Sequence, residues 1–191
     1  MQNKHNQSGR SMIEMLGVLA IIGVLSVGGF SLVSKVQENQ RINEVIDNIT
    51  SLAYKVRPVM RNYRNGDSAA FGYASLTQYL YASKAYPEGM EVEGVNFVDR
   101  NNVKYRVLGV NGEDARARML YVILITGITE KMCLQLATAN YGSKASTGYV
   151  GMQISDSFTT NSLPTLTGQR TLGEAINECN NENTYIQLGF R

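Results

Sequence analysis

The stretch GRSMIEMLGVLAIIGVLSVGGF, from Gly9 to Phe30, is almost wholly apolar after Met12 and holds one acid, Glu14, near its start. Its length is close to the 20 or so residues (about 30 Å of helix) that cross a bilayer. Lys4 and Arg10 are basic residues on its N-terminal side, so the positive-inside rule predicts a cytoplasmic N-terminus and an exported remainder. We therefore expect a membrane-spanning helix over residues 12–30.

The chain beyond this stretch keeps a helical pattern but becomes amphipathic. Its apolar residues recur in steps of three and one, which places them on one stripe of a helix. The stripe consists of Ile42, Val45, Ile46, Ile49, Leu52, Ala53, Val56, Val59, Met60 and Tyr63. Only Gly28-Gly29 separates the two parts, so we expect one helix over about residues 11–64. Pro58 should kink it, because proline removes a backbone hydrogen bond.

Residues 65–191 read as a head of short helices and strands, which makes the fold class α+β. Capping-box pairs mark helices after Ser75 (with Gln78) and after Thr171 (with Glu174). A further helix is expected from Thr129 to near Gly142. Strand patterns cover residues 102–110 and 118–126 as an antiparallel pair, then 149–155 and 184–190. Residues 156–170, rich in Ser, Thr and Asn, should form an exposed loop.

Composition narrows the function classes. The chain has 191 residues and a formal charge of +2, with scattered Lys and Arg and no nucleic-acid-binding motif. Its one histidine is His5, and no metal-ligand spacing, phosphate loop or nucleophile motif occurs. We therefore expect a protein that is not an enzyme and that holds no metal or cofactor.

Cys133 and Cys179 are the only cysteines. In an exported protein such a pair is best interpreted as one disulfide, which would stabilise the fold by roughly 4 kcal/mol on the loop-entropy model. Two separate buried thiols are the alternative.

Glu14 has several possible explanations from physics alone. It can reach the membrane interface or pair with Arg10 one turn earlier, or it can await a cation on another chain and so set the register of packed helices. A cleaved secretory signal, cut near Ser26 to Gly29, is a further alternative, although an acid within its apolar region would be unusual.

These residues resemble a known family. SG-RSMIEMLGVLAIIGVLSVGG is similar to the N-terminus of type IV pilins and of the related pseudopilins of type II secretion. YASKAYPEGM and the later ITEKMCLQL are similar to the type IVb group, including the pilins of conjugative thin pili. In this family a short polar leader ends in glycine, and the fifth mature residue is Glu.

The resemblance implies a pilin fold, in which a long N-terminal helix packs on an antiparallel sheet and residues 133–179 form a disulfide-bounded region. Residues 1–9 would be the leader, cut by prepilin peptidase between Gly9 and Arg10, and residues 10–64 the helix. Arg10 would become the modified N-terminus, although the family usually has Phe or Met there, and Glu14 would direct assembly. The family often has a proline within the apolar helix, where this chain has Gly28-Gly29, a candidate soft point or close-packing site.

The function implied is a subunit of a type IVb-like pilus used in adhesion, aggregation or conjugation. Its partners would be further copies of itself, prepilin peptidase and an inner-membrane assembly platform. It would lie in the inner membrane before assembly and in an extracellular pilus afterwards. The alternatives are a pseudopilin in a periplasmic pseudopilus, or a membrane-anchored binding module that never polymerises.

Overall fold

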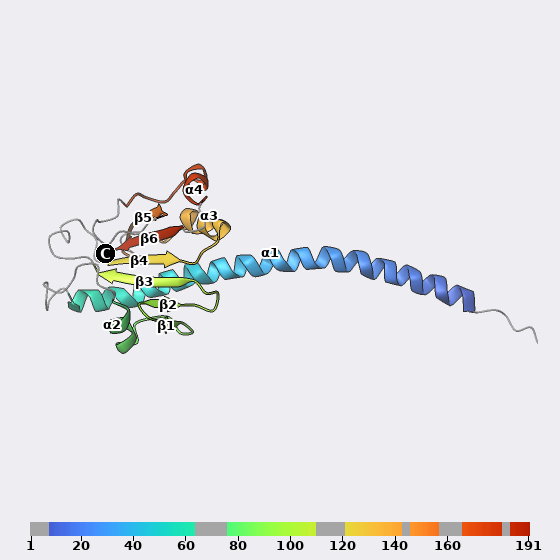
Figure 1. Cartoon of the computed structure of the whole chain (residues 1–191), viewed down its shortest axis with the longest axis horizontal. Helices are drawn as coiled ribbons and strands as arrows, with labels where there is room; N and C mark the ends of the chain where they lie inside the picture. The colour runs from blue at the N-terminus through green and yellow to red at the C-terminus, as the bar shows by residue number, and fades with distance from the viewer. Residues whose placement is uncertain (1–7, 64–75, 110–120, 143–145, 157–165, 181–183) are drawn as a thin grey trace, which may run out of the picture. The chain divides into compact units, whose positions relative to one another are not determined.

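The computed structural model describes residues 8–63, 76–109, 121–142, 146–156, 166–180 and 184–191 (Figure 1). The side chains of residues 8–11, 25–32 and 61–63 lie outside that description. The chain divides into two compact units, Met1–Arg41 and Ile42–Arg191. We call the second unit the head.

Helix α1 (Ser8–Tyr63) begins three residues before the predicted start and ends one residue before the predicted end. In the head, the predicted apolar stripe is the buried side of this helix. Seven stripe residues are buried, namely Ile42, Val45, Ile49, Leu52, Ala53, Val56 and Met60. Ile46 and Val59 are partly buried against the same core, and the side chain of Tyr63 is outside the described set. Burying a large apolar side chain stabilises a fold by roughly 1.5–3 kcal/mol. This face therefore binds the rest of the head to the C-terminal part of α1.

A six-stranded antiparallel sheet packs on this part of α1. Its strand order is β1-β2-β3-β4-β6-β5. The strands are β1 (Glu91–Glu93), β2 (Asn96–Val98), β3 (Lys104–Gly109), β4 (Tyr121–Thr126), β5 (Tyr149–Ser155) and β6 (Tyr185–Phe190). The predicted pairing of residues 102–110 with 118–126 is confirmed as β3 and β4. Successive strand residues point to opposite faces, so Tyr105 and Val107 enter the shared core while Arg106 points away from it.

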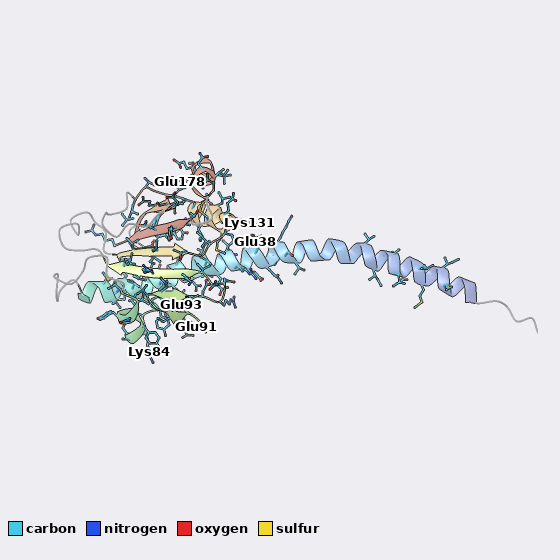
Figure 2. All side chains as sticks on the ribbon, in the orientation of Figure 1. Glu38, Lys84, Glu91, Glu93, Lys131 and Glu178 are labelled. Carbon is cyan, nitrogen blue, oxygen red and sulfur yellow. A yellow bond between two sulfur atoms is a disulfide. The ribbon has the colours of Figure 1, made fainter. Side chains whose placement is uncertain are left out.

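The β1–β2 hairpin was not predicted. Its strands have three residues each and are joined by a turn in which Gly94 has φ +60°. Glu91 and Glu93 on β1 are exposed (Figure 2). Charged side chains on a short outer strand discourage further strand pairing.

The described part of the head also contains three short helices: α2 (Thr77–Ala82), α3 (Glu130–Thr138) and α4 (Leu172–Glu178). The Thr129 cap on α3 and the Thr171–Glu174 capping box on α4 are both confirmed. Helix α3 stops at Thr138, earlier than predicted. Helix α2 ends before Pro87 as predicted, but its N-cap is Leu76 without a side-chain hydrogen bond, and Ser75 lies outside the described residues.

The expected exposed loop over 156–170 is only partly described. Thr167 lies in it and forms a β-bridge with Met152, with backbone hydrogen bonds of 2.8 and 2.9 Å. Residues 157–165 are outside the description.

A buried acid joins α1 to the turn between β2 and β3. Asp99 is 7% exposed and accepts hydrogen bonds from Tyr105 Oη at 2.7 Å and from Asn48 Nδ2, on α1, at 3.3 Å. Nearby, Glu44 on α1 pairs with Arg100 at 2.6 Å. These polar contacts fix the position of the turn along the helix.

Within the described ranges we find no helix with a stretch both long and apolar enough to cross a bilayer. The membrane span expected over residues 12–30 stays a prediction, because the side chains of residues 25–30 lie outside the described set.

Candidate assembly site and the disulfide-bounded region

The first half of α1 exposes apolar side chains on every side. Residues 12–24 are all exposed, from 53% for Ile22 to 76% for Val24 among the large apolar side chains. Monomeric proteins rarely expose contiguous apolar patches beyond roughly 300–600 Å² without a function. This segment, which we call the apolar segment, is therefore the first candidate for an interface.

Glu14 is the one charged residue of the apolar segment. Its side chain is exposed, and none of the described cations forms a salt bridge with it. The expected pairing of Glu14 with Arg10 stays a prediction, because the side chain of Arg10 lies outside the described set. Gly9 and Arg10 are both helical, within the first turn of α1. Gly9, Arg10 and Glu14 belong to the first unit, and the two cysteines belong to the head.

The predicted disulfide is confirmed. Cys133 on α3 and Cys179 at the C-terminus of α4 are bonded, with Cα atoms 5.8 Å apart, and both side chains are fully buried. Glu178 pairs with the largely buried Arg170 at 2.8 Å, and the Arg170 backbone N–H donates to Ala137 O on α3 at 3.3 Å. The bridge and these contacts hold both helices in one C-terminal region.

Buried tyrosines surround the sheet and α1. Tyr121 Oη donates to Ala53 O of α1 at 2.8 Å, and Tyr141 Oη donates to Leu136 O at 2.8 Å. Burial raises the pKa of both hydroxyls above the usual value, and desolvation raises the pKa of Tyr149 to about 12. These phenols stay neutral at physiological pH, and those of Tyr121 and Tyr141 bind the backbone of helices α1 and α3.

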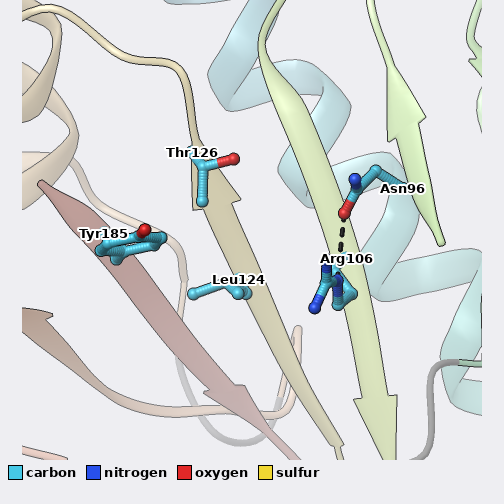
Figure 3. A pocket seen from close by; sticks show the side chains of 5 residues that line it. All are labelled: Asn96, Arg106, Leu124, Thr126 and Tyr185. Atoms are coloured by element: carbon cyan, nitrogen blue, oxygen red, sulfur yellow. Dashed lines mark hydrogen bonds between the residues drawn. The ribbon is translucent and has the colours of Figure 1, made fainter. Parts of the chain in front are cut away.

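The described residues include no group of three or more His, Cys, Asp or Glu side chains that could hold a metal ion. They do include a pocket of about 370 Å³, on the sheet face turned away from the core (Figure 3). It is lined by Asn96, Arg106, Leu124, Thr126 and Tyr185, from four neighbouring strands. No sequence motif marks these residues, because only the strand register brings them together.

Comparisons with known proteins bear on the fold. No protein-family model matches the chain, and no curated protein sequence matches it. Among solved structures, the type IVb pilin from Salmonella typhi matches with a TM-score of 0.52 and 19% sequence identity, over 76% of this chain and 95% of that chain. The long helix, the antiparallel sheet and the Cys133–Cys179 bridge together give this chain a type IV pilin-like fold.

Proposed function

We propose that the chain is the structural subunit of a type IVb-like pilus. The observation that carries the proposal is the combination of a pilin-like head with an apolar segment exposed on every side. Packing such segments against one another would bury them, since removal of apolar surface from water stabilises association. The partners of the segment are therefore further copies of this chain, and the assembled filament lies outside the cell.

Processing would prepare the subunit for this packing. Prepilin peptidase would cut between Gly9 and Arg10 and free the amine of Arg10, which an assembly platform would then bring to the growing filament. The cut falls in the first turn of α1, where helices fray and where glycine weakens the helix by about 1 kcal/mol relative to alanine. Local opening there gives a peptidase access to the peptide bond.

Glu14 would then select the correct register. Among packed apolar helices an unpaired carboxylate is costly, and a positive group on the neighbouring subunit removes that cost. The freed amine at Arg10, four residues before Glu14, is such a group. A subunit in the wrong register would leave both charges unpaired.

The test is Glu14→Ala in cells that assemble the wild-type chain, with filaments counted by electron microscopy. We expect the variant to keep a folded, disulfide-bonded head and to form no filaments. Glu38→Ala, which removes an acid further along α1 (Figure 2), is the matched control and should assemble. Normal filaments from Glu14→Ala would refute the role of Glu14, and a wild-type chain that never polymerises would refute the filament itself.

The N-terminal residue and intact mass of the chain separate the alternatives. A start at Arg10 supports prepilin processing, whether or not the amine is methylated. A retained Met1 favours an anchored binding module that does not polymerise, and a start near residues 27–31 indicates an ordinary signal peptide. A pseudopilin would share the start at Arg10 but give only a short periplasmic filament.

A further inference from the structure

The pocket on the outer sheet face carries a cation that lacks an acidic partner among the described residues. Arg106 Nε donates to the neutral amide oxygen of Asn96 at 3.0 Å (Figure 3), and none of the described carboxylates forms a salt bridge with this guanidinium. The neighbouring cation on β3, Lys104, pairs with Glu93 at 2.8 Å. The described part of the pocket is therefore positive, with its charge concentrated on Arg106.

The other lining residues give the pocket an apolar floor and polar sides. Leu124, only 3% exposed, is the cross-strand partner of Arg106, so the floor lies directly beside the guanidinium. Tyr185 is half-buried on the far side of Leu124, and Thr126 lies one step along β4 (Figure 3). A ligand in this position meets a guanidinium, an aromatic ring, a hydroxyl and an amide.

This combination selects a small anionic ligand with alternating apolar and hydroxylated surfaces. A guanidinium presents five N–H donors in a planar fork that matches a carboxylate, and one of these donors is used by Asn96. The tyrosine ring offers apolar surface, Leu124 closes the floor with only 3% of its surface exposed, and Thr126 offers a hydroxyl. The volume lies at the small end of ligand pockets, roughly 300–1,000 Å³.

We propose that this pocket binds a carboxylate-bearing sugar of the uronic acid class. The carboxylate contacts Arg106, the apolar face of the sugar ring lies on the Tyr185 ring above the Leu124 floor, and ring hydroxyls contact Asn96 and Thr126. A small open site of this kind binds weakly on its own. If the chain forms the proposed filament, the site repeats along it, and for a ligand that carries several such sugars this multivalency raises the apparent affinity by about 10²–10⁴ without a new contact.

The experiment measures binding of glucuronic acid to the full chain, kept unassembled in an uncharged polyoxyethylene detergent that carries no sugar. Uncharged methyl glucoside is the control ligand, and titration calorimetry is the assay. We expect glucuronic acid to bind, methyl glucoside to bind at least about tenfold more weakly, and added salt to weaken the first interaction. Equal binding of the two sugars, or no binding of glucuronic acid, overturns the proposal.

Two variants locate the site. Arg106→Gln keeps a polar side chain without the charge and should weaken glucuronic acid binding by at least about tenfold. Arg100→Gln removes the same charge from the β2–β3 turn and should leave binding unchanged. If Arg106→Gln binds as the wild type does, the pocket is not the site. If it instead abolishes filaments while the wild-type chain fails to bind glucuronic acid, the pocket is a contact between subunits and the proposal is wrong. Because binding is measured on unassembled chain, its failure is independent of the proposed filament.

Discussion

Asp99 is the buried acid that joins α1 to the sheet, and Asp99→Ala should destabilise the head strongly. The four donors to its carboxylate lie on α1, on β3 and in the β2–β3 turn. They are Asn101 N at 2.9 Å, Val103 N at 3.0 Å, Tyr105 Oη at 2.7 Å and Asn48 Nδ2 at 3.3 Å. Alanine removes every acceptor at once and leaves no side chain that could replace them.

The magnitude follows from how many of these donors are buried. Val103 and Tyr105 are 1% and 0% exposed, so water cannot readily replace the lost acceptor. Each orphaned buried donor costs about 1–3 kcal/mol, and the two outer hydrogen bonds add less. The expected loss in free energy of unfolding is about 3–5 kcal/mol, a large share of the 5–15 kcal/mol typical of a domain. For a domain of this size that lowers Tm by about 6–20 °C.

Urea unfolding followed by circular dichroism measures this loss. Asp47→Ala, which removes an exposed acid from the same helix, is the control and should change stability by less than about 0.5 kcal/mol. Tyr105→Phe alone should cost about 1–2 kcal/mol, and the double variant should lose less than the sum, because the two residues share a hydrogen bond. A loss below about 1 kcal/mol for Asp99→Ala, or strict additivity, would refute the reasoning.

Two further predictions concern the rest of the head. Replacing Cys133 and Cys179 by alanine should lower the free energy of unfolding by about 4 kcal/mol, because the bridge spans a separation of 46 residues; a urea series in which the double variant matches the wild type would contradict it. Burial raises the pKa of four tyrosine hydroxyls above the unfolded value of 10.0: Tyr105, Tyr121, Tyr141 and Tyr149. Since the pKa is higher in the folded state, the protonated hydroxyls contribute fully to the stability of the fold below about pH 10. Above that pH the free energy of unfolding falls by up to about 1.4 kcal/mol per tyrosine per pH unit. Urea midpoints that stay constant from about pH 9 to pH 11 would contradict this.

The elements whose signals are local could be predicted from the sequence. The apolar stripe of α1 has the period of a helix. From Ile42 to Met60, the face of the helix that is buried is the face that the stripe predicts. Thr129 and Thr171 are caps whose partners lie three residues away. The disulfide could be predicted because the chain holds only two cysteines.

Features that depend on distant pairing could not be predicted in the same way. The β1–β2 hairpin has too few residues for a strand pattern, and it exists because β2 pairs with β3. Asp99 reads in sequence as an ordinary turn residue, and only the fold brings Asn48 to it. The pocket around Arg106 likewise depends on the register of four strands.

The two halves of α1 place similar residues in opposite environments, and that contrast carries the functional argument. Ile49 in the head is fully buried, whereas Ile13 in the apolar segment is 73% exposed. A helix gains nothing from apolar residues on all its faces unless other molecules cover them. An apolar cover alone would favour an apolar residue in place of Glu14, because an unpaired carboxylate is costly in such surroundings. In the proposed filament a cover made of processed copies would supply a cationic amine, so substitution of Glu14 is the change that tests filament assembly against simple apolar association.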